Sequence, residues 1–477
     1  MSADPISVPK QLGISGSPHR YWVMLRNIVL ALASLGSVRL LGRFYGLVGL
    51  STIWSSYVFF HPREGLWITP ALVMAASLVC PPEGFQWGAG YSPELAYWAI
   101  AVCLPFAAML LRYVWSKREK SERRTAMGGV SPPRAFYVFA AISVLAVVIG
   151  LFRGYPILNI LKQFFGCALL CGYFLLGLRF APNRGDIEEV MGRTIAAGVV
   201  CAAIYEGIYL YQVPELGLRK ELTILSAYAG GLAVLLFARF IGKKTGTRSR
   251  LGLLLATILL GVPLLAQFKR AVAACFICAA LALGLRSPSR RKRYFYVATA
   301  FLLFTAMITT DLLNPIGAWF SRYPDLQSLF PEDIQSSYSV FLRTTESTQV
   351  IESLGGVPLL GTGLGSTLSW YDPMTGVTWE QETLDVGWVY LLVKLGLVGT
   401  AAFVWLAWGL GTRAIGAFKD TLHVGLFLLF VFQLLQMIAD PFFVYFMTAP
   451  WAGTTCAFLH ILNCDKPGLA SPQPEAS

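Results

Sequence analysis

Charged residues are scarce in this chain of 477 residues, since Asp, Glu, Lys and Arg make up only 13% of it. An average soluble domain carries about 25%. A soluble protein of this size needs far more polar surface, so the composition excludes that class. Hydrophobic residues reach 56%, and the mean hydropathy is +0.60. Both values are typical of a protein that crosses a membrane several times.

The sequence also lacks a disulfide framework and a cleavable signal peptide. Its nine cysteines lie mostly in or beside apolar segments, and the pair Cys275-x-x-Cys278 has no second pair, so packing is favoured over metal binding. The first 20 residues are polar and rich in proline and glycine. We therefore expect the first apolar segment to act as its own insertion signal.

Apolar segments fill most of the chain. A membrane-spanning helix needs about 20 mostly apolar residues, and this rule predicts an all-α, polytopic transmembrane helical bundle of about 12–14 spans, with one long external loop containing amphipathic helices. Fourteen candidate segments lie at 22–38, 44–60, 66–81, 95–112, 135–152, 157–178, 190–211, 222–241, 251–268, 270–286, 294–310, 386–411, 421–438 and 442–462.

The net charge of +12 could suggest nucleic-acid binding, but the basic residues cluster in short connections between apolar segments. Basic connections of this kind stay in the cytoplasm and can also bind anionic lipid headgroups. A cytoplasmic N-terminus leaves 22 Lys and Arg in the inner connections and nine in the longer outer ones. The predicted regions are a cytoplasmic tail (1–21), transmembrane helices (22–310), an external loop (311–385), C-terminal transmembrane helices (386–463) and a second cytoplasmic tail (464–477).

The external loop is much longer than the other connections, and long loops usually carry function. An amphipathic helix is predicted over 336–356 because apolar and threonine side chains recur there at helical spacing. Glycines and a proline end this helix, and a glycine turn follows it. The residues concerned are Phe341, Thr345, Thr348, Ile351 and Leu354 for the face, Gly355, Gly356 and Pro358 for the stop, and Gly361, Gly363 and Gly365 for the turn.

Three cations are placed at the outer surface by this topology. Lys269 and Arg270 stand between two spans with almost no connection, and Arg343 lies on the predicted loop helix. A guanidinium group has a rigid fork of donors that suits phosphate oxygens, so an anion site is one interpretation. The alternatives are snorkelling side chains at the interface and an ordinary ion pair between Arg343 and Glu346.

Three acids, Glu380, Glu382 and Asp385, precede the span at 386–411. Acids at a helix N-terminus are favoured by the helix dipole alone. All four histidines are predicted inside or near the inner face, however, so a carboxylate is the candidate general base for an outer site. Asp385 is nearest the span and is the preferred candidate, with Glu382 beside it.

The segments "FLRTTESTQVIESLGGVPLLGTGLGS" and "LDVGWVYLLVKLGLVG" resemble the O-antigen ligase and O-antigen polymerase (Wzy-type) superfamily of membrane glycosyltransferases. The family pattern is an arginine-bearing helix, a Pro-x-x-Gly-x-Gly-x-Gly turn, and a short motif opening a span that ends Gly-x-x-Gly. "FKRAVAA" around Arg270 is similar to an earlier family motif but lacks its Ser and Gly. Ligases carry a histidine where this chain has Asp385, whereas many polymerases carry an acid.

The resemblance implies a metal-independent glycosyltransferase in a bacterial inner membrane, with no cofactor and its site facing the periplasm. It would transfer a glycan from undecaprenyl pyrophosphate to the hydroxyl of a lipid-linked acceptor sugar, as a polymerase of O-antigen or exopolysaccharide repeat units. Arg270, Arg343 and Lys269 would bind the pyrophosphate, and Asp385 or Glu382 would orient or deprotonate the acceptor. Expected partners are the lipid-linked oligosaccharide, membrane lipid and a chain-length regulator or other polysaccharide-assembly protein, but no nucleic acid.

Three other functions stay open, and one of them is a structural membrane scaffold, although a scaffold would not need the paired arginines. A ligase would share this fold and transfer the glycan to lipid A core or to protein. A flippase or transporter of lipid-linked sugars would tend to show inverted repeats and charges in the middle of its spans, and neither is clear in this sequence. The long external loop favours an enzyme over a flippase.

Overall fold

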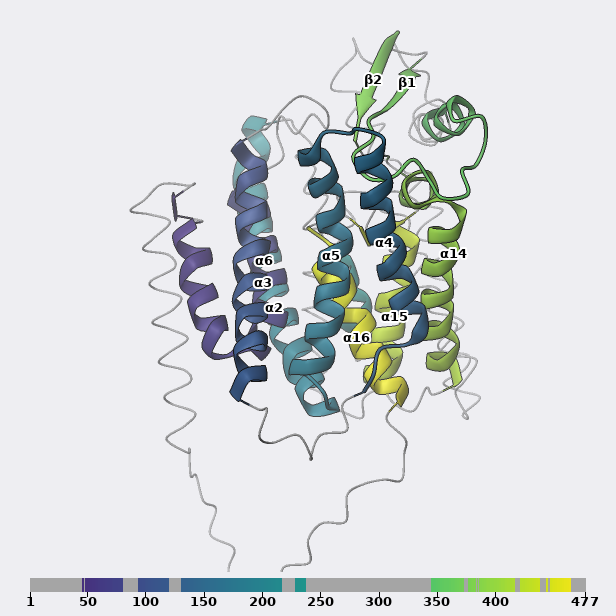
Figure 1. The fold of residues 1–477 in the computed structure, drawn as a ribbon. Coiled ribbons are helices and arrows are strands. Elements are labelled where there is room, and N and C mark those ends of the chain that lie inside the picture. The colour runs from purple at the N-terminus through teal and green to yellow at the C-terminus, as the bar shows by residue number, and fades with distance from the viewer. Residues whose placement is uncertain are drawn as a thin grey trace, which may run out of the picture.

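The structure is a computed structural model that describes residues 45–46, 48–79, 93–119, 130–216, 228–236, 345–372, 376–382, 384, 386–416, 421–437, 443–444 and 447–464. Figure 1 shows its helices standing side by side as a bundle, with a small β-hairpin at one end. In chain order the elements are a helix Val48–Phe60, η1 (Pro62–Glu64), α2 (Gly65–Val79), α3 (Pro93–Glu119), α4 (Arg134–Phe152), α5 (Ile157–Phe180), α6 (Arg184–Leu216), helical residues 228–236 and 345–353, β1 (Leu368–Asp372), β2 (Val377–Gln381), α14 (Gly387–Gly416), α15 (Thr421–Gln436) and α16 (Ala449–Cys464).

Every predicted span that falls on described residues overlaps a helix, whereas 22–38, 251–268, 270–286 and 294–310 lie outside them. Three described helices, α4, α5 and α14, are long and apolar enough to cross a membrane. Residues 48–60, 100–115 and 422–436 form shorter apolar helices. The described helices thus suggest a membrane protein that is mostly helical, and the number of spans stays a prediction.

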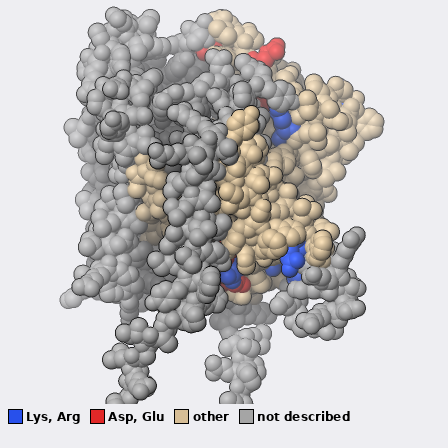
Figure 2. All heavy atoms as spheres, turned by 90° about the vertical axis from the view of Figure 1, so that its left-hand side faces the viewer, with Lys and Arg blue, Asp and Glu red and all other residues tan. Residues whose placement is uncertain are grey.

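The outward faces of α4 and α14 are apolar. Large side chains there are exposed, among them Val144 and Leu151 on α4 and Trp405 and Trp408 on α14. Such a surface is unfavourable in water but suits contact with lipid tails. Figure 2 shows another face of the molecule, where the visible charged residues lie toward the two ends of the described surface and the part between them carries none.

The centre of the bundle is α16, whose residues Ala449–Leu462 are all buried. It packs closely against α5 because small residues lie at the contact. A Cβ added at Gly453 would lie 2.4 Å from the carbonyl oxygen of Leu170, and one at Gly177 would lie 2.7 Å from the Cβ of Ala457. Small residues are the usual means by which membrane helices approach each other.

Helix ends that the sequence assigns to one side of the membrane meet in the structure. Near the ends predicted as cytoplasmic, His460 Nε2 lies 2.9 Å from the carbonyl oxygen of Ser131, and the Asn463 amide donates to Leu410 O at 3.0 Å. Near the opposite ends, the Trp388 N–H donates to Met437 O at 3.3 Å. The alternation of helix directions therefore agrees with the prediction, while the side that faces the cytoplasm stays a prediction.

The external loop contains a β-hairpin, which the predicted all-α fold did not include. β1 and β2 form an antiparallel hairpin in which Trp370 pairs with Trp379. Its turn includes Gly376, which has a φ of +69° and whose N–H donates to Asp372 O at 2.9 Å. The sequence pattern typical of a hairpin was present in "LSWYDPMTGVTWEQ", where residues that favour β-strands flank an Asp-Pro and a glycine.

The predicted loop helix is described over 345–353, and Gly355 and Gly356 end it with φ values of +69° and +118°. Of the predicted amphipathic face, Leu354 packs against the core whereas Thr348 is exposed, and Glu346 and Val350 are the fully buried residues of this helix. Glu346 is buried because the side-chain amide of Gln381, at the end of β2, donates a hydrogen bond to its carboxylate. A contact from another element therefore set the rotation of this helix.

Candidate functional site

The glycine turn lies inside the bundle instead of at its surface. We call residues 358–366 the glycine segment; Gly361–Ser366 are all buried. The segment contacts the outer ends of α4, α5 and α14, since Leu364 N–H donates to Ala146 O at 3.0 Å. The expectation of a simple turn between the loop helix and the next element is thus corrected. We call this end of the bundle, which also carries the hairpin, the loop end.

The glycine segment occupies a break in α14. The sequence predicts one continuous span at 386–411, but Gly396 has a φ of +73° and interrupts the helix. A break frees backbone groups that must be bonded elsewhere in a membrane protein. The segment bonds them in pairs: Thr362 N–H to Val393 O at 2.7 Å, Gly363 N–H to Lys394 O at 3.2 Å, Leu397 N–H to Pro358 O at 3.0 Å and Val398 N–H to Leu359 O at 3.2 Å.

Glycine is required on both sides of this contact. Gly361 has a φ of +77°, and a Cβ there would lie 2.4 Å from the carbonyl oxygen of Lys394. A Cβ at Gly396 would lie 2.3 Å from the N atom of Gly361. Gly363 and Gly365 also have positive φ. The three glycines of the predicted turn are therefore needed for close approach and unusual backbone geometry.

Gln163 on α5 connects both arms of the loop to the bundle. Its Oε1 accepts from the Gly365 N–H at 2.8 Å, and its Nε2 donates to Ser366 O and Glu382 O, each at 3.3 Å. Gln163 is 5% exposed. One buried side chain thus holds the glycine segment and the connection that leads from β2 to α14.

Two lysines and one predicted acid share this end of the bundle. Lys162 Nζ lies 3.3 Å from Glu382 Oε1, and both side chains are about one-third exposed, at 33% and 28%. Lys394 is fully buried; its Nζ donates to the carbonyl oxygen of Ser366 and, at 2.8 Å, to Ser366 Oγ. A buried ammonium needs such acceptors. Lys162, Lys394 and Glu382 thus lie at the loop end, which also carries Arg153, exposed directly after α4.

The predicted site residues fall into two groups. Glu382 and the three glycines are described, and the structure brings them together through Gln163. Glu380 lies on β2 with an exposed side chain. Asp385, Arg343, Arg270 and Lys269 lie outside the described residues. Sequence reasoning missed Lys162, Gln163 and Lys394, whose polar character within apolar spans was a usable signal.

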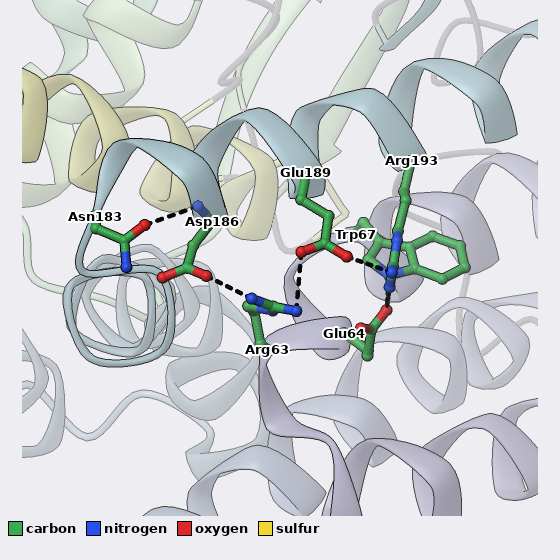
Figure 3. Close-up of polar contacts among 7 residues, drawn as sticks. All are labelled: Arg63, Glu64, Trp67, Asn183, Asp186, Glu189 and Arg193. Atoms are coloured by element: carbon green, nitrogen blue, oxygen red, sulfur yellow. Dashed lines mark hydrogen bonds and ion pairs between the residues drawn. The ribbon is translucent and has the colours of Figure 1, made fainter. Parts of the chain in front are cut away.

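A second polar cluster joins η1 to the start of α6 at the opposite end of the bundle, which we call the ion-pair end. Arg63 lies between two acids of α6, contacting Asp186 and, at 2.9 Å, Glu189 Oε2. Figure 3 shows Arg193 reaching Glu189 on its own helix and Glu64 below it. The sequence analysis did not identify this cluster.

Local interactions support the ion-pair cluster. Asn183 Oδ1 accepts from the Asp186 N–H at 2.9 Å and so caps α6, and Trp67 Nε1 donates to Glu64 Oε2 at 2.6 Å. Burial alone would lower the pKa of Arg63, but the hydrogen bond that Arg63 donates to Asp186 and the nearby carboxylates raise that pKa above its usual value. Arg63 therefore stays charged, and the cluster is an electrostatic link between two helices.

Comparisons of the chain with protein-family models, curated proteins and solved structures find no match. The structure alone therefore describes the protein: a helical bundle with three helices long and apolar enough to cross a membrane, and with a loop segment inserted into the break of one of them.

Proposed function

We propose that this protein is a membrane glycosyltransferase that polymerises glycan repeat units, taking the glycan from an undecaprenyl-pyrophosphate donor and joining it to a hydroxyl of a lipid-linked acceptor sugar. The observation that supports this most is the insertion of the loop into the membrane bundle. Non-helical backbone at membrane depth is tolerated where it is buried in protein or lines a functional cavity. A loop that only connected two spans would have no need of this arrangement.

The polar groups of the loop end also support the proposal. The donor is an anionic lipid, so its site requires cations near the outer membrane surface. Lys162, which is about one-third exposed, and Arg153, which is exposed directly after α4, give the described part of this end two accessible basic side chains. In the proposal, Arg270, Arg343 and Lys269 hold the pyrophosphate and stabilise charge that develops on the leaving group.

The acids have separate roles in this mechanism. Asp385 acts as the general base that takes the proton from the acceptor hydroxyl, since it is the acid nearest to the span. Glu382 contacts Lys162 and, through its carbonyl oxygen, Gln163. We therefore propose that Glu382 positions the connection between β2 and α14. It also acts as a general base only if its negative charge is needed for turnover.

Reconstitution with lipid-linked oligosaccharide tests the function. The purified protein in proteoliposomes is expected to produce longer glycans on the lipid. Transfer to lipid A or to protein would favour a ligase, and translocation without elongation would favour a flippase. No change in any of these three measurements would contradict all of the proposed activities.

Variants test the assigned residues in the same assay. Asp385→Asn keeps the size of the side chain and its hydrogen bonds but loses the base, so the rate is expected to fall by roughly 10²–10⁴. Arg270→Ala and Arg343→Ala are each expected to abolish polymer. Arg184→Ala is the matched control because its exposed pair with Glu188 lies at the start of α6. Full activity of any site variant would remove that residue from the site.

The orientation is tested by labelling of introduced cysteines. A cysteine at Thr348, an exposed position of the loop helix, is expected to react with a membrane-impermeant reagent in intact cells, whereas a cysteine at Ser289 is not. The opposite pattern would reverse the topology and place the loop end in the cytoplasm.

A further inference from the structure

Two glutamines lie within the apolar helix α15. Gln433 and Gln436 are 0% and 1% exposed, and Trp451 of the neighbouring helix α16 is 1% exposed. Gln433 Nε2 donates to Thr455 Oγ1 at 3.1 Å, which shows that this glutamine faces α16. Buried polar residues inside a membrane bundle are costly and usually functional.

Four polar atoms of these side chains have no hydrogen-bond partner among the described residues. They are Gln433 Oε1, Gln436 Oε1, Gln436 Nε2 and Trp451 Nε1. Unpaired polar atoms are strongly unfavourable in apolar surroundings, and native structures rarely retain them without a reason. We call these three side chains the glutamine–tryptophan cluster.

The helix register brings the members of the cluster to one level. α15 and α16 run in opposite directions, and Gln433 contacts Thr455. One helical turn toward the loop end therefore places residues 436–437 of α15 beside Trp451 of α16. Gln436 lies on nearly the same side of α15 as Gln433 because the two are three residues apart.

The cluster lies next to the start of α14. The Trp388 N–H donates to the carbonyl oxygen of Met437, which directly follows Gln436. An aromatic wall is supplied by Tyr228, whose ring centre is 5.8 Å from that of Trp451 and whose hydroxyl donates to Met447 O at 2.6 Å. The cluster is thus close to the connection that carries the acids of the proposed site.

The four atoms define the chemistry of a matching ligand. Two are acceptors and two are donors, so a ligand that satisfies them must both donate and accept hydrogen bonds. A phosphate dianion accepts only, and an ammonium, a guanidinium or a metal ion offers no acceptor. Hydroxyl groups do both, and carbohydrates present several of them beside apolar C–H faces that suit aromatic rings.

We propose that the glutamine–tryptophan cluster is a carbohydrate subsite that binds hydroxyl groups of the lipid-linked glycan. The identity of the glycan's carrier rests on the proposed function, whereas the hydroxyl chemistry rests on the cluster itself. Water has the same donor and acceptor capacity, and the experiment distinguishes it from a sugar.

Ligand binding is measured with the full-length protein in nanodiscs. The two probes are undecaprenyl pyrophosphate carrying the oligosaccharide purified from the cells that express the chain, and undecaprenyl pyrophosphate without sugar. The variants are Gln436→Met, which keeps length without polar atoms, and Trp451→Phe, which removes the N–H. Controls are Trp408→Phe, at a residue 71% exposed, and Gln349→Met, at an exposed side chain of the loop.

The native protein is expected to bind the sugar-bearing lipid more tightly than the bare lipid. Each cluster variant is expected to weaken binding of the sugar-bearing lipid by roughly 5- to 30-fold, since one or two hydrogen bonds are lost, and to leave the bare lipid unaffected. The Tm of Gln436→Met without ligand is expected to be unchanged or higher, because orphaned polar atoms are removed. The controls are expected to bind both lipids as tightly as the native protein does.

Three results would overturn the subsite. Unchanged binding of the sugar-bearing lipid in both variants would mean that the cluster holds no sugar, and a lower Tm of Gln436→Met would then indicate that it holds water. Equal loss for both lipids would mean that it acts on the carrier instead of the sugar. Lack of preference for the sugar-bearing lipid in the native protein would also exclude it, while elongation in the proteoliposome assay would still stand.

Discussion

At the loop end, the glycine segment meets α14 through paired backbone hydrogen bonds, whereas at the ion-pair end η1 and α6 meet through charged side chains. The part of the first contact formed by Gly361–Ser366 is buried, and close approach requires glycine in both segments. The second is partly exposed, with side-chain exposures from 10% for Glu64 to 39% for Glu189. The ends of one bundle thus depend on different physical effects.

This difference predicts how each end responds to change. Backbone hydrogen bonds buried away from water are insensitive to salt, and they break when the two segments cannot approach each other closely. Exposed ion pairs contribute little individually and weaken as salt screens them. The loop end should therefore be rigid and intolerant of substitution, and the ion-pair end should be tolerant and adjustable.

The largest effect is expected from Gly361→Ala. The new Cβ would meet Lys394 O at 2.4 Å in a backbone with a φ of +77°, and strain plus overpacking should cost about 3–5 kcal/mol. Gly154→Ala is the matched control, because Gly154 has a φ of +73° with no atom within 4 Å and should cost about 1–2 kcal/mol. The Tm in detergent measures both. Equal losses would mean that the close approach to α14 does not stabilise the fold.

An intermediate effect is expected from Gln163→Leu. It leaves the buried Gly365 N–H and two carbonyl oxygens without their partner, at a cost of about 2–4 kcal/mol. Gln349 makes a similar pair of bonds to Tyr371, at 2.7 and 3.0 Å, but in an exposed setting. Gln349→Leu should therefore cost only about 0.5–1 kcal/mol. Comparison of the two Tm values measures the contribution of burial to the stability loss. A larger loss at Gln349 would contradict the role of Gln163 in holding the glycine segment and the connection between β2 and α14.

The smallest effect is expected at the ion-pair end. Glu64→Gln weakens the contact with Arg193, at a cost of about 1 kcal/mol at low salt that should shrink as salt is raised. The control Glu188→Gln, in an exposed pair with Arg184, should cost about 0.3–0.5 kcal/mol. Thermal unfolding at two salt concentrations measures both. A loss at Glu64 that does not depend on salt would indicate that the cluster is a buried network similar to the loop end.

The sequence by itself determined the helical elements and the membrane character. Apolar runs at 135–152 and 157–178 correspond closely to α4 and α5, because a span depends on its own length and hydropathy. The end of the loop helix was also predictable, since Gly355 and Gly356 adopt positive φ within a local motif. Such features need no information from distant parts of the chain.

Only the tertiary structure decided the break in α14, the rotation of the loop helix and the partners of the polar side chains. The break is stable because the glycine segment supplies the missing hydrogen bonds, and Gln163 reaches Ser366 across 203 positions of sequence. Arg193 reaches Glu64 across 129 positions. Local propensity does not depend on residues so far away in the sequence. Hydropathy therefore predicts a continuous helix at 386–411 and gives no reason for a lysine at 394.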